Sequence, residues 1–396
     1  MNNKLYFVIK LLKNKLSFIL SDRKFWSIIG ILILIRTIMV FALINGVPET
    51  PWHHGWYLYH GGDQIEYFRL AYSIALFNPV SSQYPMGLPL LLVPLIYLFN
   101  ATTFQDILAP GVILHSVVLF NLSIILVALI TKTLFKNKLI AIISAILWTI
   151  LPYLVYLTLI IINPIMAGVT LVRFMWTQIM SDPPSVFFIL LSVYLYLLSK
   201  KKKEAYPIMT GISVGFSMLI RLTNMIMPIF FVFAYIYHKK YKYALYFAIA
   251  TLLVFSPQLI YNYYFYNMSP TFGYGQTQII SFNDSSTSSI IKIEFFYKFL
   301  NQILKDKYLP LLAIGLFFLI LSFISSYKKN LKSTIFLSLW ILTYTIFYSF
   351  SAFGFLDPIR YLMPIYPAVI ILISSLIYDV IISLHGILTK YGGNTY

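Results

Sequence analysis

Long apolar runs separated by short blocks of basic residues fill most of this 396-residue sequence. Hydrophobic residues make up 60% of the chain and charged residues only 10%, whereas a water-soluble domain carries about 25% charged residues. A helix of about 20 apolar residues crosses a hydrocarbon core of about 30 Å, and lipid offers backbone groups no other hydrogen-bonding partner. The sequence therefore predicts an all-α, polytopic integral membrane protein.

About ten segments satisfy this length rule. They lie near residues 27–45, 112–131, 139–157, 184–199, 206–220, 223–237, 243–262, 309–326, 333–350 and 361–381. A further apolar run, residues 84–99, contains three prolines and is predicted to lie along the outer membrane surface as a juxtamembrane element. The main lysine blocks and both termini then face the cytoplasm, as the positive-inside rule requires. We expect one multi-pass domain over residues 1–396, in the cell membrane or, in a eukaryote, the endoplasmic reticulum membrane.

The net charge of +17 does not indicate a nucleic-acid partner, because the basic residues stand between apolar runs and set membrane orientation. Residues 1–25 are predicted to form a cytoplasmic amphipathic segment rather than a cleaved signal. The chain contains no cysteine, which excludes disulfides, thiolate nucleophiles and cysteine-ligated metals.

Most acidic residues fall on the outward side of this topology. Nine of the twelve do so: Glu49, Asp63, Glu66, Asp106, Asp182, Asp284, Glu294, Asp306 and Asp357. The largest outward loops are predicted at residues 46–111, 158–183 and 263–308. Any chemistry is therefore expected on the extracytoplasmic face.

Two of these carboxylates stand at predicted helix starts. Asp63 precedes Glu66 by three residues, a spacing that also fits a capping box. Helical geometry then puts Asp63, Glu66 and Tyr67 along one side, facing the same cavity or the same solvent. Asp182 precedes two prolines and equally fits a helix N-cap. The carboxylates could instead form a base with an orienting partner, or bind a hard divalent cation such as Mg²⁺ or Mn²⁺.

Arginines also occur near the outer helix ends, at Arg173, Arg221 and Arg360. Such residues commonly extend their charge to the interface, but guanidinium groups also bind phosphate bidentately, and Lys292 is a weaker candidate for that role. Arg36 stands in the middle of the first span, where a charge requires a partner or a wet cavity.

The segment before Asp63 is rich in histidines and aromatic residues. These are His53, His54, His60, Trp52, Trp56, Tyr57 and Tyr59. The histidines could ligate a metal, although their spacing matches no tight signature. The aromatic residues fit an interfacial belt, or a platform for a sugar ring.

Six stretches of the sequence resemble, in the same order, motifs of one membrane enzyme superfamily. They are GGDQIEYFRLAYSIA, SQYPMGLPLLLVPLIYLF, SDPPSVFFILLSVYLYL, GISVGFSMLIRLTNMIMPIFF, SPQLIYNYYFYNMSPTFGYG and DPIRYLMPIYPAVIIL. The sequence resembles the GT-C superfamily of polyprenyl-phosphate-sugar glycosyltransferases, particularly the protein O-mannosyltransferase-like and aminoarabinose-transferase-like branches. It differs from their usual pattern in having Leu222 where a proline commonly follows the arginine.

The resemblance implies a reaction in which a sugar passes from a polyprenyl phosphate to an acceptor hydroxyl on a glycan, lipid or protein, with inversion. It implies that Asp63 is the base, with the lipid tail in a groove between spans. The other roles that it implies are acceptor orientation or cation binding for Glu66 and Asp182, phosphate binding for Arg221, Arg360, Arg173 and Lys292, and sugar or acceptor binding for Tyr67, Tyr84 and Trp56.

Two other classes of protein remain open at this stage. A secondary transporter would place ionisable or broken-helix sites near the membrane midplane, where only Arg36 lies here. A non-catalytic scaffold, or a flippase for lipid-linked sugars, would also be apolar and multi-pass. Substitution of Asp63 distinguishes them, since an enzyme loses turnover and a scaffold does not.

Overall fold

The computed structural model describes residues 22–42, 53–54, 58–59, 63–82, 84–161, 164–199, 204–266, 293–303, 309–350 and 358–392. These residues are almost entirely helical, apart from a short antiparallel pair of strands, β1 (His53–His54) and β2 (Leu58–Tyr59). The all-α prediction is confirmed. The predictions at Trp56, His60 and Lys292 concern positions outside the described residues.

The described part of the chain contains α-helices, one π-helix and two 3₁₀ helices. In chain order they are α2 (Asp22–Ala42), α3 (Asp63–Ala75), α4 (Gly87–Phe99), α5 (Phe104–Val112), the π-helix η2 (Ile113–Leu119), α6 (Phe120–Phe135), α7 (Lys138–Ile160), α8 (Pro164–Phe174), α9 (Asp182–Ser199), α10 (Ala205–Ile220), the 3₁₀ helix η3 (Leu222–Met225), α11 (Ile226–Tyr237), α12 (Tyr241–Tyr266), α14 (Ile293–Ile303), α15 (Leu309–Lys329), α16 (Leu331–Ser349), α17 (Pro358–Tyr361), the 3₁₀ helix η4 (Met363–Ile365) and α18 (Tyr366–Gly392).

Seven of the described helices are long and apolar enough to cross a membrane. They are Asp22–Ala42, Phe104–Phe135, Lys138–Ile160, Asp182–Ser199, Tyr241–Phe265, Leu331–Ser349 and Met363–Leu384. The remaining predicted spans, 206–220, 223–237 and 309–326, correspond to α10, α11 and α15. The structure thus has the polytopic helical architecture that the apolar runs predicted.

Asparagine side chains cap the N-termini of two helices that follow tight turns. Asn137 accepts hydrogen bonds from the backbone N–H groups of Leu139 (2.8 Å) and Ile140 (3.2 Å) at the start of α7. Asn330 likewise accepts from the N–H of Ser333 (3.2 Å) at the start of α16. Its amide also donates to the carbonyl of Leu134 at 2.8 Å, so the two turns lie together. The lysine blocks around these two turns therefore lie on the same side of the protein.

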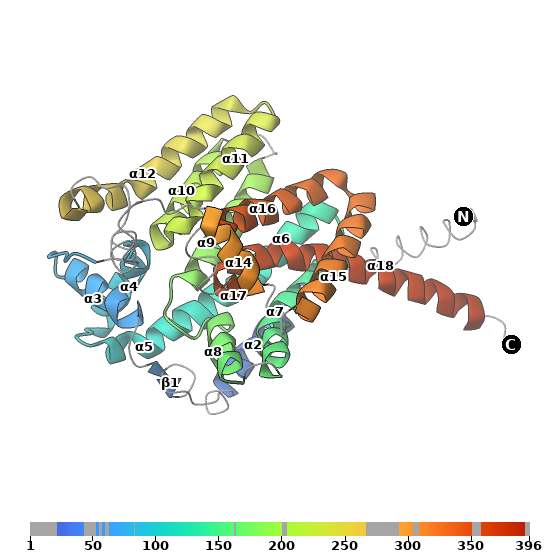
Figure 1. Ribbon diagram of the computed structural model, residues 1–396, viewed down its shortest axis with the longest axis horizontal. Coiled ribbons are helices and arrows are strands. Elements are labelled where there is room, and N and C mark those ends of the chain that lie inside the picture. The colour runs from blue at the N-terminus through green and yellow to red at the C-terminus, as the bar shows by residue number, and fades with distance from the viewer. Residues whose placement is uncertain are drawn as a thin grey trace.

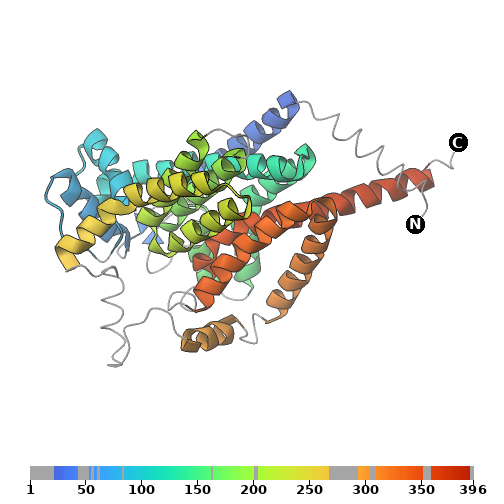
Figure 2. The ribbon, with the colours of Figure 1, turned by 90° about the horizontal axis from the view of Figure 1, so that it is seen from above.

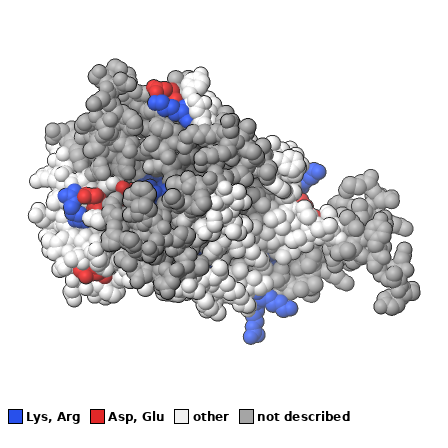
Figure 3. Space-filling view, turned by 60° about the horizontal axis from the view of Figure 1, so that its bottom comes forward, with Lys and Arg blue, Asp and Glu red and all other residues white. Residues whose placement is uncertain are grey.

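The helix α9 lies at the centre of the fold. Of the 18 residues of α9, 72% are buried, compared with 22% of an 18-residue stretch of α2 and 28% of one in α12. The peripheral α2 presents apolar side chains such as Ile31 and Leu34 outward, as a lipid-facing helix does. Figure 3 shows one face of the protein, on which charged side chains of the described residues form only a few separate spots.

The helices α3, α4 and α5 gather at one end of the molecule, whereas α18 extends beyond the other end (Figures 1 and 2). The helix α4 has 13 residues and a length of about 20 Å, less than the hydrocarbon core of about 30 Å. This length agrees with the non-spanning prediction. The segment before α4 also contacts α12, because Tyr261 Oη donates to the carbonyl of Val80 at 2.7 Å.

Candidate functional site

Asp63 is the first residue of α3, at the end of the molecule where α3 and α4 meet (Figure 1). Its Oδ1 accepts a hydrogen bond from Tyr84 Oη at 2.7 Å, and its Oδ2 lies 3.7 Å from Arg360 Nη2. Glu66, one turn later, forms an exposed ion pair with Arg69 at 2.9 Å. The two carboxylates predicted to share one cavity or solvent face therefore have different partners.

Asp182 is the first residue of α9, and its side chain is only 3% exposed. One carboxylate oxygen forms an ion pair with Arg221, and the other accepts from Arg360 Nε at 2.8 Å. Arg221 is itself buried and stands where α10 ends, in extended conformation. A carboxylate with so little access to water needs opposite charge, and Asp182 has two guanidinium partners.

Arg360, from α17, links the two carboxylates. Its guanidinium faces Asp182 through Nε and Asp63 through Nη2. The structure thus brings together four residues selected from the sequence for different motifs, and we call Asp63, Asp182, Arg221 and Arg360 the charged cluster. Formal charges within it cancel.

Two tyrosines that the sequence did not single out lie against this cluster. The Tyr361 ring centre is 4.7 Å from Arg221 Cζ and 5.6 Å from Arg360 Cζ, within the range of cation–π contacts. The ring of Tyr348, in α16, lies 5.8 Å from that of Tyr361, and its Oη donates to Thr223 Oγ1 at 2.7 Å. Adjacency to Arg360 could have indicated Tyr361, but nothing in the α16 sequence pattern indicates Tyr348.

The other predicted site residues do not belong to the charged cluster. Tyr67 is buried, and the centre of its ring lies 4.7 Å from that of Tyr84. Arg173 lines a small recess together with Asp182 and Arg360. Side-chain positions of His53 and His54 are outside the described part of the chain.

The two predicted cation ligands, Asp63 and Asp182, have a positively charged partner in the structure. No group of three or more His, Asp or Glu side chains among the described residues could hold a metal ion. Asp63 and Asp182 both face the guanidinium of Arg360, so a positive side chain already lies between the two predicted ligands. Guanidinium and metal ion would compete for the same oxygens.

Close packing of α4 on the end of α10 helps to place Arg221. A Cβ atom on Gly87 would overlap the backbone of Leu219 and Ile220, directly before Arg221. We expect Gly87→Ala to destabilise the protein by about 1–3 kcal/mol and to lower activity, because this backbone must shift. Thermal unfolding in detergent measures the change. Gly30→Ala is the control, since no atom lies within 4 Å of its added Cβ, and an equal loss in both variants would contradict the expectation.

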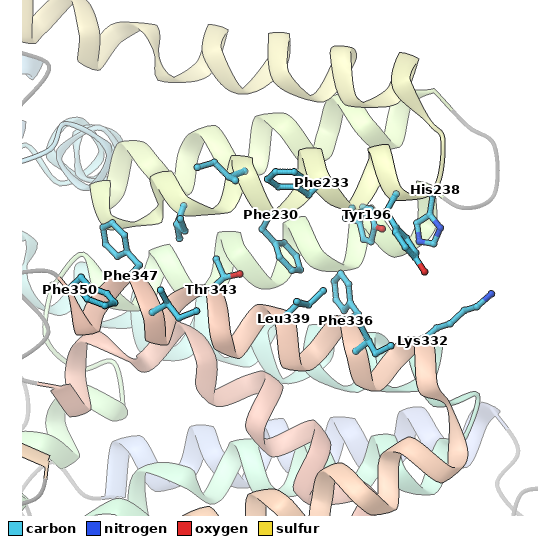
Figure 4. A pocket seen from close by; sticks show the side chains of 16 residues that line it. Tyr196, Phe230, Phe233, His238, Lys332, Phe336, Leu339, Thr343, Phe347 and Phe350 are labelled. Atoms are coloured by element: carbon cyan, nitrogen blue, oxygen red, sulfur yellow. The ribbon is translucent and has the colours of Figure 1, made fainter. Parts of the chain in front are cut away.

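A long apolar groove lies between α11 and α16, with a cavity volume of about 790 Å³. Figure 4 shows Phe230 and Phe233 of α11 facing Phe336 and Leu339 of α16 across it. At one end of the groove are Lys332 and His238, and at the other are Phe347 and Phe350. At the latter end the ring of Phe347 packs against that of Tyr348, which in turn contacts Tyr361 beside the charged cluster.

Comparison with known proteins supports this architecture. No model of a protein family and no curated protein matches the sequence. Crystal structures of the Archaeoglobus fulgidus oligosaccharyltransferase are similar to this chain. The form tethered with an acceptor peptide containing the NVT sequon gives a TM-score of 0.57 at 16% identity, covering 90% of this chain and 49% of that chain. The apo form gives 0.54 at 13% identity, covering 93% and 52%.

The complex of that protein with Zn and sulfate gives a TM-score of 0.55 at 18% identity, covering 92% of this chain and 51% of that chain. This chain thus spans about half the length of the structures it matches. The similarity extends over nearly all of the present chain, and it concerns the fold. The chain therefore shares the fold of these oligosaccharyltransferase structures, in agreement with the GT-C-like fold predicted from the sequence.

Proposed function

We propose that this protein is a membrane glycosyltransferase, which takes a sugar from a polyprenyl phosphate and transfers it to an acceptor hydroxyl on the extracytoplasmic face. One observation carries the proposal: α16 lines the apolar groove and also supplies Tyr348, whose ring packs against that of Tyr361 beside the two arginines of the charged cluster. A polyprenyl-phosphate donor has a long apolar tail, which suits the groove, and an anionic phosphate, which suits the arginines.

The groove suits an isoprenoid tail in length and in lining. From Lys332 to Phe350 the α16 backbone rises by about 27 Å, close to the hydrocarbon thickness of about 30 Å. The lining is mostly aromatic and aliphatic, and the groove lies on the side of α11 where Phe233 is 67% exposed. An apolar tail placed there would cover surface that otherwise contacts membrane lipid.

Arg221 and Arg360 are suited to the donor phosphate. The carbon–oxygen bond to the phosphate breaks with its electron pair on oxygen, so negative charge grows on the leaving group and no proton is required there. Guanidinium groups stabilise such charge, and both are held by Asp182 before any donor binds. Arg173, which lines the adjoining recess, would add positive charge.

Asp63 is suited to the role of base. Its side chain is 26% exposed, against 3% for Asp182, and Tyr84 fixes its orientation. The carboxylate would take the proton of the acceptor hydroxyl while that oxygen attacks the anomeric carbon and the phosphate leaves. A single displacement of this kind inverts the configuration. Glu66 gains no support from its pairing with Arg69, and Asp182 is better suited to holding the arginines than to contacting the acceptor.

The proposal leaves the acceptor class broad. The similar oligosaccharyltransferase was crystallised with an acceptor peptide, so a protein acceptor is included here beside glycans and lipids. A divalent cation bound by Asp63 and Asp182, such as Mg²⁺ or Mn²⁺, would have to displace the Arg360 guanidinium from their oxygens.

The groove is tested by filling it. We expect Leu339→Trp to raise the KM for a long-chain polyprenyl-phosphate sugar about tenfold, because the indole occupies space that the tail needs. The purified protein is incubated with a panel of such donors and sugar consumption is measured. Leu342→Trp is the matched control, since Leu342 is also half exposed on α16 but does not line the groove. Equal KM values for the two variants would place the tail elsewhere, and no turnover with any donor would refute the proposed function.

A further inference from the structure

The segment 175–181, between α8 and α9, is buried along its whole length and ends directly before Asp182. Thr177, for example, is 1% exposed. Connections normally run over the surface, because buried backbone groups need hydrogen-bonding partners. Trp176 has a φ of 60°, an unfavourable backbone conformation for a bulky residue that its surroundings must enforce. Other parts of the chain must therefore hold this segment in place.

Arg36 holds the start of the segment. Its Nη2 donates to the carbonyl of Met175 at 2.7 Å and to Ser116 Oγ at 2.8 Å, and its Nη1 donates to the carbonyl of Ser116. Ser116 Oγ also donates to the Met175 carbonyl at 2.7 Å, and the guanidinium lies 4.0 Å from the centre of the Phe120 ring. The mid-span charge is thus stabilised by carbonyl groups and an aromatic face, at the π-helix η2.

Gln64 holds the second half of the segment 175–181. Its Oε1 accepts from the backbone N–H of Ile179 at 2.8 Å, and the side chain is fully buried. Gln64 follows Asp63 in α3, while Ile179 stands three residues before Asp182. This hydrogen bond therefore links the residue next to Asp63 to the backbone that leads into Asp182. The His115 ring lies 3.3 Å from the Gln178 carbonyl and adds a contact from η2.

We propose that the buried segment 175–181 sets the position of Asp182 relative to Asp63, and that Arg36, Ser116 and Gln64 are positioning residues for the charged cluster. Arg36 fixes the segment to α2 and η2, and Gln64 fixes it to α3. The effect on sugar transfer rests on the proposed function, whereas the fixing of the segment does not. Preorganised carboxylates and arginines depend on such supporting hydrogen bonds.

A cysteine reporter tests the fixing directly. The chain has no cysteine, so Thr177→Cys provides one thiol in a buried, nearly isosteric position. We expect Arg36→Gln and Gln64→Met, each added to this parent, to speed its reaction with N-ethylmaleimide at least about tenfold, because lost hydrogen bonds let the segment open. Ser116→Ala should give a smaller increase in the labelling rate. Arg36→Lys should give a lower labelling rate than Arg36→Gln, because it keeps the positive charge.

Lys329→Gln is the control, because it breaks a comparable polar contact, with Asp379 and Ser375, between α15 and α18. It should leave the labelling rate unchanged. Unchanged rates in the Arg36, Ser116 and Gln64 variants would overturn the inference, whether or not the protein transfers sugar. Rates raised equally by Lys329→Gln would do the same, since they would report general loosening.

A turnover measurement then separates positioning from mere stability. Gln64→Met should lower kcat about tenfold with little change in the donor KM, because the donor-binding groove is untouched. In an Asp182→Asn background the same substitution should add little, since Gln64 acts through Asp182. A full tenfold loss in both backgrounds would refute the positioning role. Failure of the parent itself to turn over any donor would count against the proposed function, and the labelling rates would still decide the inference.

Discussion

Asp63→Asn should reduce sugar transfer by about 10²–10⁴-fold while the protein remains folded, the usual contribution of a general base. The amide has nearly the same size as the carboxylate and can still accept the hydrogen bond from Tyr84. It cannot take up a proton from an acceptor hydroxyl, so the loss should appear in kcat. Turnover of a polyprenyl-phosphate sugar by the purified variant, beside its melting temperature, measures this.

Glu66→Gln is the matched comparison, on the same helix and one turn away. Glu66 pairs with Arg69 and both side chains are about half exposed, so we expect this variant to keep at least half of the activity. Activity above half of the wild-type value in Asp63→Asn would exclude Asp63 as the base. Equal large losses in both variants would show that the two acids act together, contrary to their separate partners in the structure.

The second large effect concerns stability. Asp182→Ala should destabilise the protein by about 3–5 kcal/mol and strongly reduce turnover, because it leaves the buried Arg221 without its carboxylate. Arg360 would lose its 2.8 Å contact as well, and with it a fixed orientation toward the donor phosphate. Thermal and chemical unfolding in detergent, monitored by circular dichroism, gives the change in stability.

An exposed ion pair supplies the control for this measurement. Glu204 pairs with Lys242 at 2.8 Å, and both side chains are more than half exposed. Glu204→Ala should therefore cost less than about 1 kcal/mol. A similarly small cost for Asp182→Ala would show that Arg221 reaches solvent or another partner. In the double variant Asp182→Asn with Arg221→Gln, stability should partly recover because that unpaired charge is gone, but activity should not.

The sequence predicted the helical, membrane-spanning architecture because the bilayer permits few alternatives. A run of about 20 apolar residues must form a helix there, and the basic blocks must stay out of the hydrocarbon. The positive-inside rule also placed residues 84–99, which contain three prolines, along the outer surface and not across the membrane. These conclusions depend on local composition, which any window of the sequence contains.

Single site residues were also recognisable, but their partners were not. Asp182 was selected as a carboxylate at an outer helix start, and Arg221 and Arg360 as guanidinium groups near outer helix ends that could bind phosphate. Nothing in the spacing shows that Asp182 is shared by the two arginines, or that Arg360 lies between it and Asp63. Asp182 and Arg360 are 178 residues apart in sequence.

The charge of Arg36 shows the same division. Its mid-span position required a partner, and the sequence offered no carboxylate for it. The structure provides carbonyl groups from Ser116 and Met175, which every residue possesses and no sequence pattern marks. The role of Gln64 could not be predicted either, because the sequence does not show whether an amide at a helix start is buried or faces solvent.

The sequence by itself determined that this chain is a multi-pass helical membrane protein with acidic and basic residues predicted at its outer face. Only the tertiary structure decided which of those charges meet, which tyrosines enclose them and where a long apolar groove opens. The physical reason is that hydrophobicity acts on each segment separately, whereas ion pairs and hydrogen bonds depend on how distant segments pack.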